Sequence, residues 1–181
     1  MKKTLLFAMM AMWCGACAAT DLQSNPELRA MNRADAADRE PDKIDWTVVN
    51  AKDAQRRQRV SEMLAHGEIR TAEDFYFAGM IYQHGEGPED IRLAQAFATI
   101  ASKLEPEHPA PKWLFAASWD RYLMWKKLPQ WYGTQYQVSQ EGVRTLYPVD
   151  PNAVTDAERA AFHVPSLAEA MAEAEGEASH D

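Results

Sequence analysis

KWLFAASWDRYLMWKK, residues 112–127, is the stretch that decides the fold. When it is placed on a helical wheel at 100° per residue, its apolar side chains cover every side of the wheel. A helix that is apolar all round is a buried helix. We therefore predict that this segment is the central helix of the domain and that the remaining helices pack around it.

Four more helices are predicted on the N-terminal side of this segment. The signals are capping residues, apolar side chains at helical spacing, and prolines and glycines at helix ends. Thr71 and Asp74, for example, resemble a capping box, and Gly67 supplies a stop. The predicted helices cover residues 24–40, 51–67, 71–85 and 88–104, with a loop over 41–50. The sequence thus predicts an all-α protein, an irregular bundle of about five main helices.

The C-terminal part has less helical periodicity. Residues 129–151 are rich in Gln, Tyr, Gly and Pro, which indicates an ordered loop packed on the central helix. The loop contains one short strand at most, over 134–138, and a single strand cannot form a sheet. Short helices are expected after the loop, the first over 154–162. We expect one helical domain over 19–170 and an acidic, disordered tail over 171–181.

The first 18 residues are typical of a bacterial secretory signal peptide. A short basic start precedes an apolar run from Leu5 to Trp13, which is too short to span a bilayer as a helix. Ala16–Ala18 fits a cleavage site, whereas Gly15-Ala16-Cys17 fits the end of a lipobox and would place a lipid anchor on Cys17. We expect a periplasmic or exported protein that touches a membrane only through such an anchor.

The net charge, the positions of the cysteines and the absence of known catalytic motifs argue against several classes of function. The formal net charge of −8 argues against nucleic acid and anionic lipid headgroups as main partners, because both reward basic patches. Both cysteines, Cys14 and Cys17, lie in the targeting segment, so the mature domain has no thiolate for a disulfide, a nucleophile or a metal. The sequence also lacks H-x-x-x-H, H-E-x-x-H and G-x-S-x-G patterns. We therefore predict no metal ion and no cofactor.

Asp120 is the first candidate for a special role. It lies among apolar neighbours on the wheel, where an ionised carboxylate is costly unless it is paired and hydrogen-bonded. The following segment, QWYGTQ over 130–135, offers backbone N–H groups and polar side chains. We predict that Asp120 and Arg121 anchor this segment. In the alternative hypothesis Asp120 is a base in a pocket floored by the segment, with Tyr132 and Gln135 orienting a substrate.

His84 ends the third predicted helix and is the second candidate. A protonated histidine is favourable at a helix C-terminus, so a cap is its simplest interpretation. It could instead face Glu89 or Asp90 across the turn and form an acid/base or metal pair. An enzyme hypothesis uses Asp120 as the base and His84 as the acid, and it requires both in one pocket.

Aromatic and charged residues add two further expectations. Trp113, Trp119, Trp125 and Trp131 are expected mostly in the core, although some could line a groove for a sugar or peptide ring. Opposite charges gather in the first two predicted helices: Asp35, Asp38 and Arg39 in one, and Arg56, Arg57 and Arg59 in the other. They predict a salt-bridge network between the helices, and the alternative is an arginine clamp for an anionic ligand.

The segments 31–40, 67–85, 111–136 and 154–170 together resemble a bacterial family of domains of unknown function. The signature is similar to Gln-His-Gly, then Trp-Leu-x-Ala-Ala-x-x-Asp-Arg, then Gln-x-Tyr-Gly-Thr-Gln. The resemblance implies that the site includes Gln83, His84, Gly85, Trp113, Asp120, Arg121, Gln130, Tyr132, Gly133, Thr134 and Gln135, and it brings no established activity. Tyr82–Ala94 also resembles a single Sel1-like or tetratricopeptide helix hairpin, which alone cannot build a solenoid.

We therefore expect an exported helical protein that acts as a binding or structural module of the bacterial cell envelope. Its partner would be an envelope component or a small molecule. Ligand binding is assigned to Arg121, Gln130, Thr134, Gln135 and Trp113. The alternative is a small metal-independent hydrolase or lyase, with Asp120, His84 and Tyr132 as the catalytic candidates.

Overall fold

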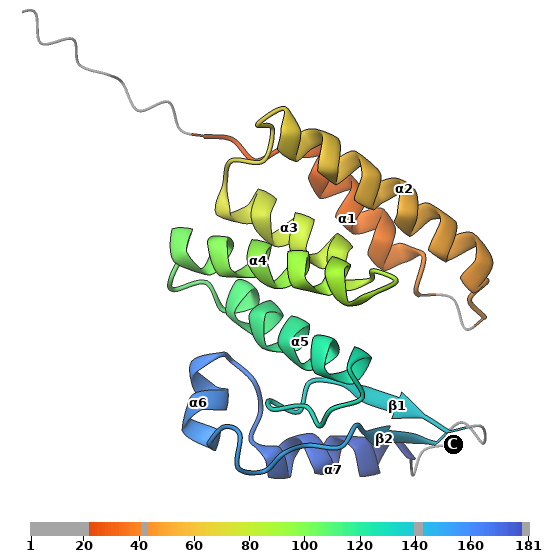
Figure 1. Ribbon diagram of the computed structural model, residues 1–181, viewed down its shortest axis with the longest axis vertical. Helices are drawn as coiled ribbons and strands as arrows, with labels where there is room; N and C mark the ends of the chain where they lie inside the picture. Colours follow the sequence, from red (N-terminus) through yellow and green to blue (C-terminus); the bar gives the residue numbers. More distant parts are fainter. Residues whose placement is uncertain (1–21, 41–42, 140–142, 179–181) are drawn as a thin grey trace, which may run out of the picture.

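The computed structural model describes residues 22–40, 43–139 and 143–178, which form seven helices and one two-stranded sheet (Figure 1). The elements are α1 (Pro26–Ala37), α2 (Trp46–Ala65), α3 (Ala72–Gln83), α4 (Pro88–Leu104), α5 (Pro109–Trp125), β1 (Tyr136–Val138), β2 (Arg144–Leu146), α6 (Asp156–Ala161) and α7 (Leu167–Ala178). The predicted all-α class with several main helices is confirmed.

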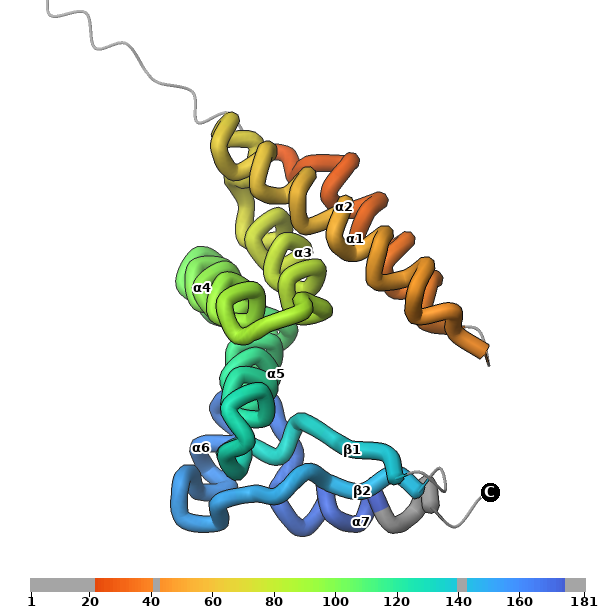
Figure 2. The backbone as a smooth tube through the Cα atoms, turned by 45° about the vertical axis from the view of Figure 1, so that its right-hand side comes forward, coloured from red at the N-terminus to blue at the C-terminus, as the bar shows by residue number. Residues whose placement is uncertain are grey.

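The helices are stacked in layers, as Figure 2 shows. α1 and α2 pack on α3, and α3 and α4 form a helix hairpin. α5 packs on α4 and separates this part from the C-terminal segment that carries β1, β2, α6 and α7. One apolar cluster lies among α1 to α4 and includes Leu28, Met63 and Ile81. A second, which includes Ala116 and Tyr132, lies between α5 and the C-terminal segment.

The prediction that the tryptophans lie mostly in the core is wrong for three of the four. Trp113, Trp125 and Trp131 are 37%, 47% and 37% exposed, and Trp119 is partly buried. The buried positions of α5 include the small residues Ala116, Ala117 and Ser118. The large rings therefore lie at the borders of the interfaces, which a wheel that counts hydrophobicity alone does not reveal.

Two helices begin earlier than predicted. α2 begins at Trp46, because the side chain of Asp45 accepts hydrogen bonds from the backbone N–H groups of the first turn. α5 begins at Pro109, with Pro111 also in its first turn, where the missing N–H of a proline costs no hydrogen bond. The Nδ1 atom of His108 caps this turn.

The strand expected near 134–138 is not single. β1 pairs with β2 in antiparallel fashion, with Tyr136 opposite Leu146 and Val138 opposite Arg144. α7 packs against β2 and supports the pair. The sequence prediction failed here because a strand of three residues carries too little alternation to be recognised.

α7 ends at Ala178, beyond residue 170, where we expected the helical domain to end. The predicted signal peptide over 1–18, with Cys17, lies outside the described residues, as do residues 179–181. Among the described helices, none has the length and apolar composition that crossing a membrane requires.

Gly85 lies in the tight turn between α3 and α4. A Cβ atom at this position would lie 2.1 Å from the Cβ of Asp90, whereas a Cβ on Gly87 would meet no atom within 4 Å. We therefore expect Gly85→Ala to lower the free energy of unfolding by about 1–3 kcal/mol, the usual cost of overpacking. Urea unfolding followed by circular dichroism checks this, with Gly87→Ala as the matched control. Equal losses in both variants would contradict the steric explanation.

Candidate functional site

Asp120 fixes the loop that follows α5. Its Oδ1 atom accepts hydrogen bonds from the backbone N–H groups of Trp131 and Tyr132, at 2.8 and 3.0 Å. Its Oδ2 atom accepts from the backbone N–H and the hydroxyl of Thr134, at 3.0 and 2.9 Å. The turn passes through Gly133 at φ +87°, a conformation that favours glycine. The geometry agrees with the expected anchoring of this segment by Asp120.

The carboxylate of Asp120 is fully buried. Burial raises its pKa, and the hydrogen bonds from Tyr132, Thr134 and Trp131 oppose that rise. Four donors from the loop occupy the two oxygens. This arrangement suits a structural anchor, because a base needs a free lone pair directed at a substrate.

Gln130 braces the same loop from inside. Its side-chain N–H groups donate to the carbonyl oxygens of Gln135 and Tyr147, both at 2.8 Å, and its Oε1 atom accepts from the backbone N–H of Gln135 at 2.8 Å. The side chain is fully buried. Gln130 was expected to bind a ligand, and its place in the structure is that of a cross-link within the loop.

Arg159 is a residue that sequence reasoning missed. It is buried on α6, and its guanidinium donates to the carbonyl oxygens of Tyr132 and Trp131, at 3.1 and 2.9 Å. It also donates to the carbonyl of Val154 and to the carboxylate of Asp156. The loop is therefore held from two sides, through its N–H groups by α5 and through its carbonyl groups by α6.

Arg121, next to the anchor, has only neutral acceptors among the described residues. Its Nε–H donates to the side-chain oxygen of Gln135 at 2.9 Å, and its Nη1 atom lies 3.5 Å from the carbonyl oxygen of Gln83. The side-chain NH₂ group of Gln135 donates in turn to the carbonyl oxygen of Ala117, at 3.2 Å. Burial lowers the pKa of Arg121, and the nearby charge of Arg39 adds to that effect. In the part of the chain that the structure describes, no carboxylate pairs with this cation.

Two cavities share Arg121, Gln135 and Tyr136 in their linings. The first has a volume of about 440 Å³, and its lining includes Trp113, Arg121, Thr134, Gln135, Arg144 and Glu173. The second has a volume of about 520 Å³ and is lined by Arg121, Met124, Trp125, Lys127, Gln135 and Tyr136. Four of the five residues expected to bind a ligand thus line the first cavity, and Gln130 does not. Both volumes fall within the range of small-molecule sites.

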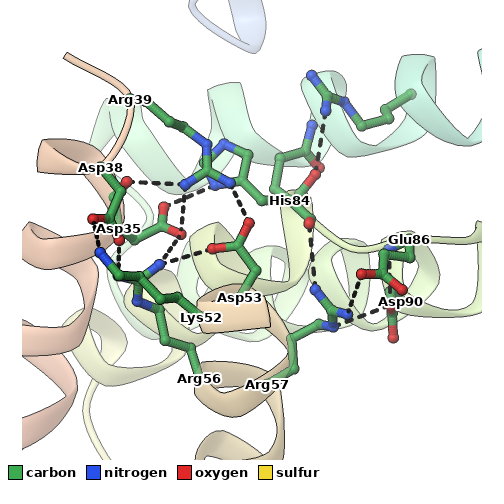
Figure 3. Close-up of polar contacts among 12 residues, drawn as sticks. Asp35, Asp38, Arg39, Lys52, Asp53, Arg56, Arg57, His84, Glu86 and Asp90 are labelled. Atoms are coloured by element: carbon green, nitrogen blue, oxygen red, sulfur yellow. Dashed lines mark hydrogen bonds and ion pairs between the residues drawn. The ribbon is translucent and has the colours of Figure 1, made fainter. Parts of the chain in front are cut away.

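His84 lies in a different network from Asp120. Its Nδ1 atom is 2.8 Å from the Oδ2 atom of Asp35 on α1, as Figure 3 shows. The expected partner Asp90 instead forms an ion pair with Arg57, at 3.2 Å. Neither His84 nor Asp120 lines either of the two cavities. The structure therefore does not bring the two groups together at these cavities, as the enzyme hypothesis requires.

A network of opposite charges joins α1 and α2, as expected (Figure 3). Arg56 lies at its centre and contacts the carboxylates of Asp53 at 2.8 Å, Asp35 at 3.5 Å, and Asp38. Arg39 also contacts Asp35 and Asp53. Burial would raise the pKa of Asp35, but the bond from His84 and the charges of His84, Arg39 and Arg56 hold that pKa below its usual value. Within the described residues, no group of three or more acidic, histidine or cysteine side chains is placed to hold a metal ion.

Comparisons with known proteins add no family: no protein-family model, no curated protein and no solved structure matches the chain. The resemblance to a bacterial family therefore stays a prediction.

Proposed function

We propose that this chain is an exported binding module of the bacterial cell envelope, whose ligand carries an anionic group that pairs with Arg121. One observation carries the proposal: Arg121 lines both cavities and has no carboxylate partner among the described residues. A cation withdrawn from water without a counter-charge is costly. A guanidinium is also the side chain best suited to bind a carboxylate through two hydrogen bonds.

The surroundings of Arg121 support this role. Gln135 holds the Nε edge of the guanidinium, while the Nη2 atom makes no hydrogen bond within the described part of the chain. Trp113 lines the same cavity and is 37% exposed, so it offers an aromatic surface to the remainder of a ligand. Thr134 lines this cavity too and is held in place by Asp120. The site is thus built on an anchored loop, which favours a preformed binding surface.

The binding hypothesis is preferred to the hydrolase or lyase alternative because of where the catalytic candidates lie. Both carboxylate oxygens of Asp120 accept hydrogen bonds from the loop, and the Nδ1 atom of His84 is hydrogen-bonded to the carboxylate of Asp35. Tyr132 is buried in the second apolar cluster, and burial raises the pKa of its hydroxyl. None of the three lines the cavities at Arg121.

Arg121→Met tests the proposal, because methionine keeps much of the side-chain volume and removes the charge. The probes are N-acetyl-dialanine, a short peptide with a free carboxylate, and its C-terminal amide, compared by isothermal titration calorimetry. We expect the wild type to bind the acid at least about tenfold more tightly than the amide, since a charge-assisted hydrogen bond contributes about 1.5–3 kcal/mol. The variant should lose this preference.

Arg33→Met is the matched control, because Arg33 is exposed on α1 and lines neither cavity. It should leave both affinities unchanged. Equal binding of the acid and the amide by the wild type, or an unchanged preference in Arg121→Met, would contradict the assignment of Arg121 to an anionic ligand.

A further inference from the structure

Lys127 adopts an unusual backbone conformation at the end of α5. Its φ is +58°, in the left-handed region that favours glycine. Its N–H donates to the carbonyl of Met124, and the N–H of Leu128 donates to the carbonyl of Leu123, at 2.9 and 3.0 Å. This is the Schellman pattern, in which glycine is the usual residue at the left-handed position. Gly67 occupies that position after α2, with φ +66°.

A lysine is less favourable than glycine in this backbone conformation. The presence of lysine here therefore points to a role of its side chain. Lys127 lines the second cavity together with Arg121. Lys127 is exposed, and its side chain makes no ion pair with the described residues. Arg121 makes none either, since its acceptors among these residues are neutral. Residues in strained conformations gather at binding sites, where the side chain has a use that offsets the strain. The second cavity thus contains two cations without a counter-charge among the described residues.

Apart from Gln135, the other walls of this cavity are apolar or aromatic. Trp125 and Tyr136 line it together with Met124, and Trp125 is 47% exposed. The guanidinium of Arg144 lies 3.6 Å from the centre of the Tyr136 ring and packs over it, which holds that ring in place. Aromatic walls favour a flat or cyclic ligand body, because rings gain contact area with little loss of conformational entropy.

We propose that the second cavity binds a carboxylate carried on a ring, with Arg121 and Lys127 pairing with the carboxylate and Trp125 and Tyr136 packing against the ring. This inference rests on the proposed function in its use of Arg121, and it adds Lys127, Trp125 and the class of ligand. The ring can be aromatic, as in an aryl acid, or a sugar, as in a uronic acid, and both present a carboxylate and a flat apolar face.

Lys127→Gly separates the two roles of this residue. Glycine relieves the backbone strain, so the melting temperature should rise by a few degrees. The same change removes a cation from the cavity, so the affinity for 3-phenylpropanoate should fall at least about fivefold, measured by isothermal titration calorimetry. The neutral 3-phenylpropanamide should bind the wild type and the variant equally.

His163→Gly is the matched control. His163 has φ +56° after α6, and the N–H of Val164 donates to the carbonyl of Arg159 at 3.0 Å, as in the turn at Lys127. It is exposed and lines neither cavity. Its replacement should raise the melting temperature and leave the affinity for 3-phenylpropanoate unchanged. Trp125→Ala, at an exposed position, is the second variant and should weaken binding by removing the contact with the ring.

Each result then decides one point. An unchanged affinity for 3-phenylpropanoate in both Lys127→Gly and Trp125→Ala would overturn the inference. The proposed function would still stand if Arg121→Met loses the preference for the peptide acid over its amide. Failure of both 3-phenylpropanoate and glucuronate to bind the wild type would also overturn it. Tighter binding of glucuronate would assign the ring to a sugar, and tighter binding of 3-phenylpropanoate would assign it to an aryl acid.

Discussion

Asp120→Asn is expected to lower the free energy of unfolding by about 3 kcal/mol at pH 7, because hydrogen bonds to a charged group contribute about 1.5–3 kcal/mol each. Each carboxylate oxygen of Asp120 accepts two donors in the wild type. Asparagine has the same shape but offers one oxygen and one NH₂ group. The NH₂ group would face either Thr134 or the pair Trp131 and Tyr132, all of which donate. Urea unfolding followed by circular dichroism measures the loss.

Thr134→Val provides a graded comparison, because it removes one hydroxyl donor and leaves the three backbone donors of the loop in place. It should cost about 1.5 kcal/mol, the lower end of the range for one hydrogen bond to a charged group. The NH₂ group of Gln135 also donates to this hydroxyl, but it keeps its second bond, to the carbonyl of Ala117. An Asp120→Asn variant as stable as the wild type would contradict the anchoring role. It would mean that the charge is kept at the expense of the fold, as at a functional site, and would revive the hypothesis that Asp120 acts on a substrate.

The anchoring of the loop could be predicted because it follows from local rules. A carboxylate among apolar helix positions must find donors, and the next segment after Pro129 cannot continue the helix and offers its N–H groups. The donors in the structure, which include Trp131 and Thr134, come from that segment. Arg159, which holds the same loop through its carbonyl groups, could not be predicted in this way. Its contacts depend on how α6 folds back, and sequence spacing carries no information about that.

The partner of His84 shows the same limit. Glu89 and Asp90 are near in sequence and were the expected partners, but Asp35 lies against His84 because α1 packs on α3. Lys127 is a second example. Helix ends are recognised in sequences by glycine, and a lysine in a left-handed conformation gives no such signal. The second cavity was therefore not anticipated, whereas four of the five residues expected to bind a ligand line the first.

Arg56→Met is expected to cause the largest loss of stability, about 3–5 kcal/mol at pH 7, the usual cost of removing one partner from a buried ion pair. Asp35 and Asp53 are each 2% exposed, and Arg56 contacts both. Without Arg56 both carboxylates still contact Arg39, and Asp35 also keeps its bond with His84. Arg59→Met on the same helix is the matched control, because Arg59 pairs with acids at the surface. Its replacement should change the free energy of unfolding little. Urea unfolding of both variants and the wild type gives the comparison.

The loss in Arg56→Met should shrink as the pH falls, and the sign follows from the direction of the pKa shifts. The hydrogen bond from Arg56 holds the pKa of Asp38 below its usual value of 3.8, and the charge of Arg56 helps to do the same for Asp35. A lowered pKa gives stability that is present above 3.8 and is lost as the pH falls through the folded-state pKa. Arg56→Met lacks the contribution that Arg56 makes to this stability. The free energies of unfolding of the variant and the wild type should therefore approach each other in acid. A difference that stays constant with pH would contradict this explanation, because methionine keeps much of the side-chain volume of Arg56 and removes its charge.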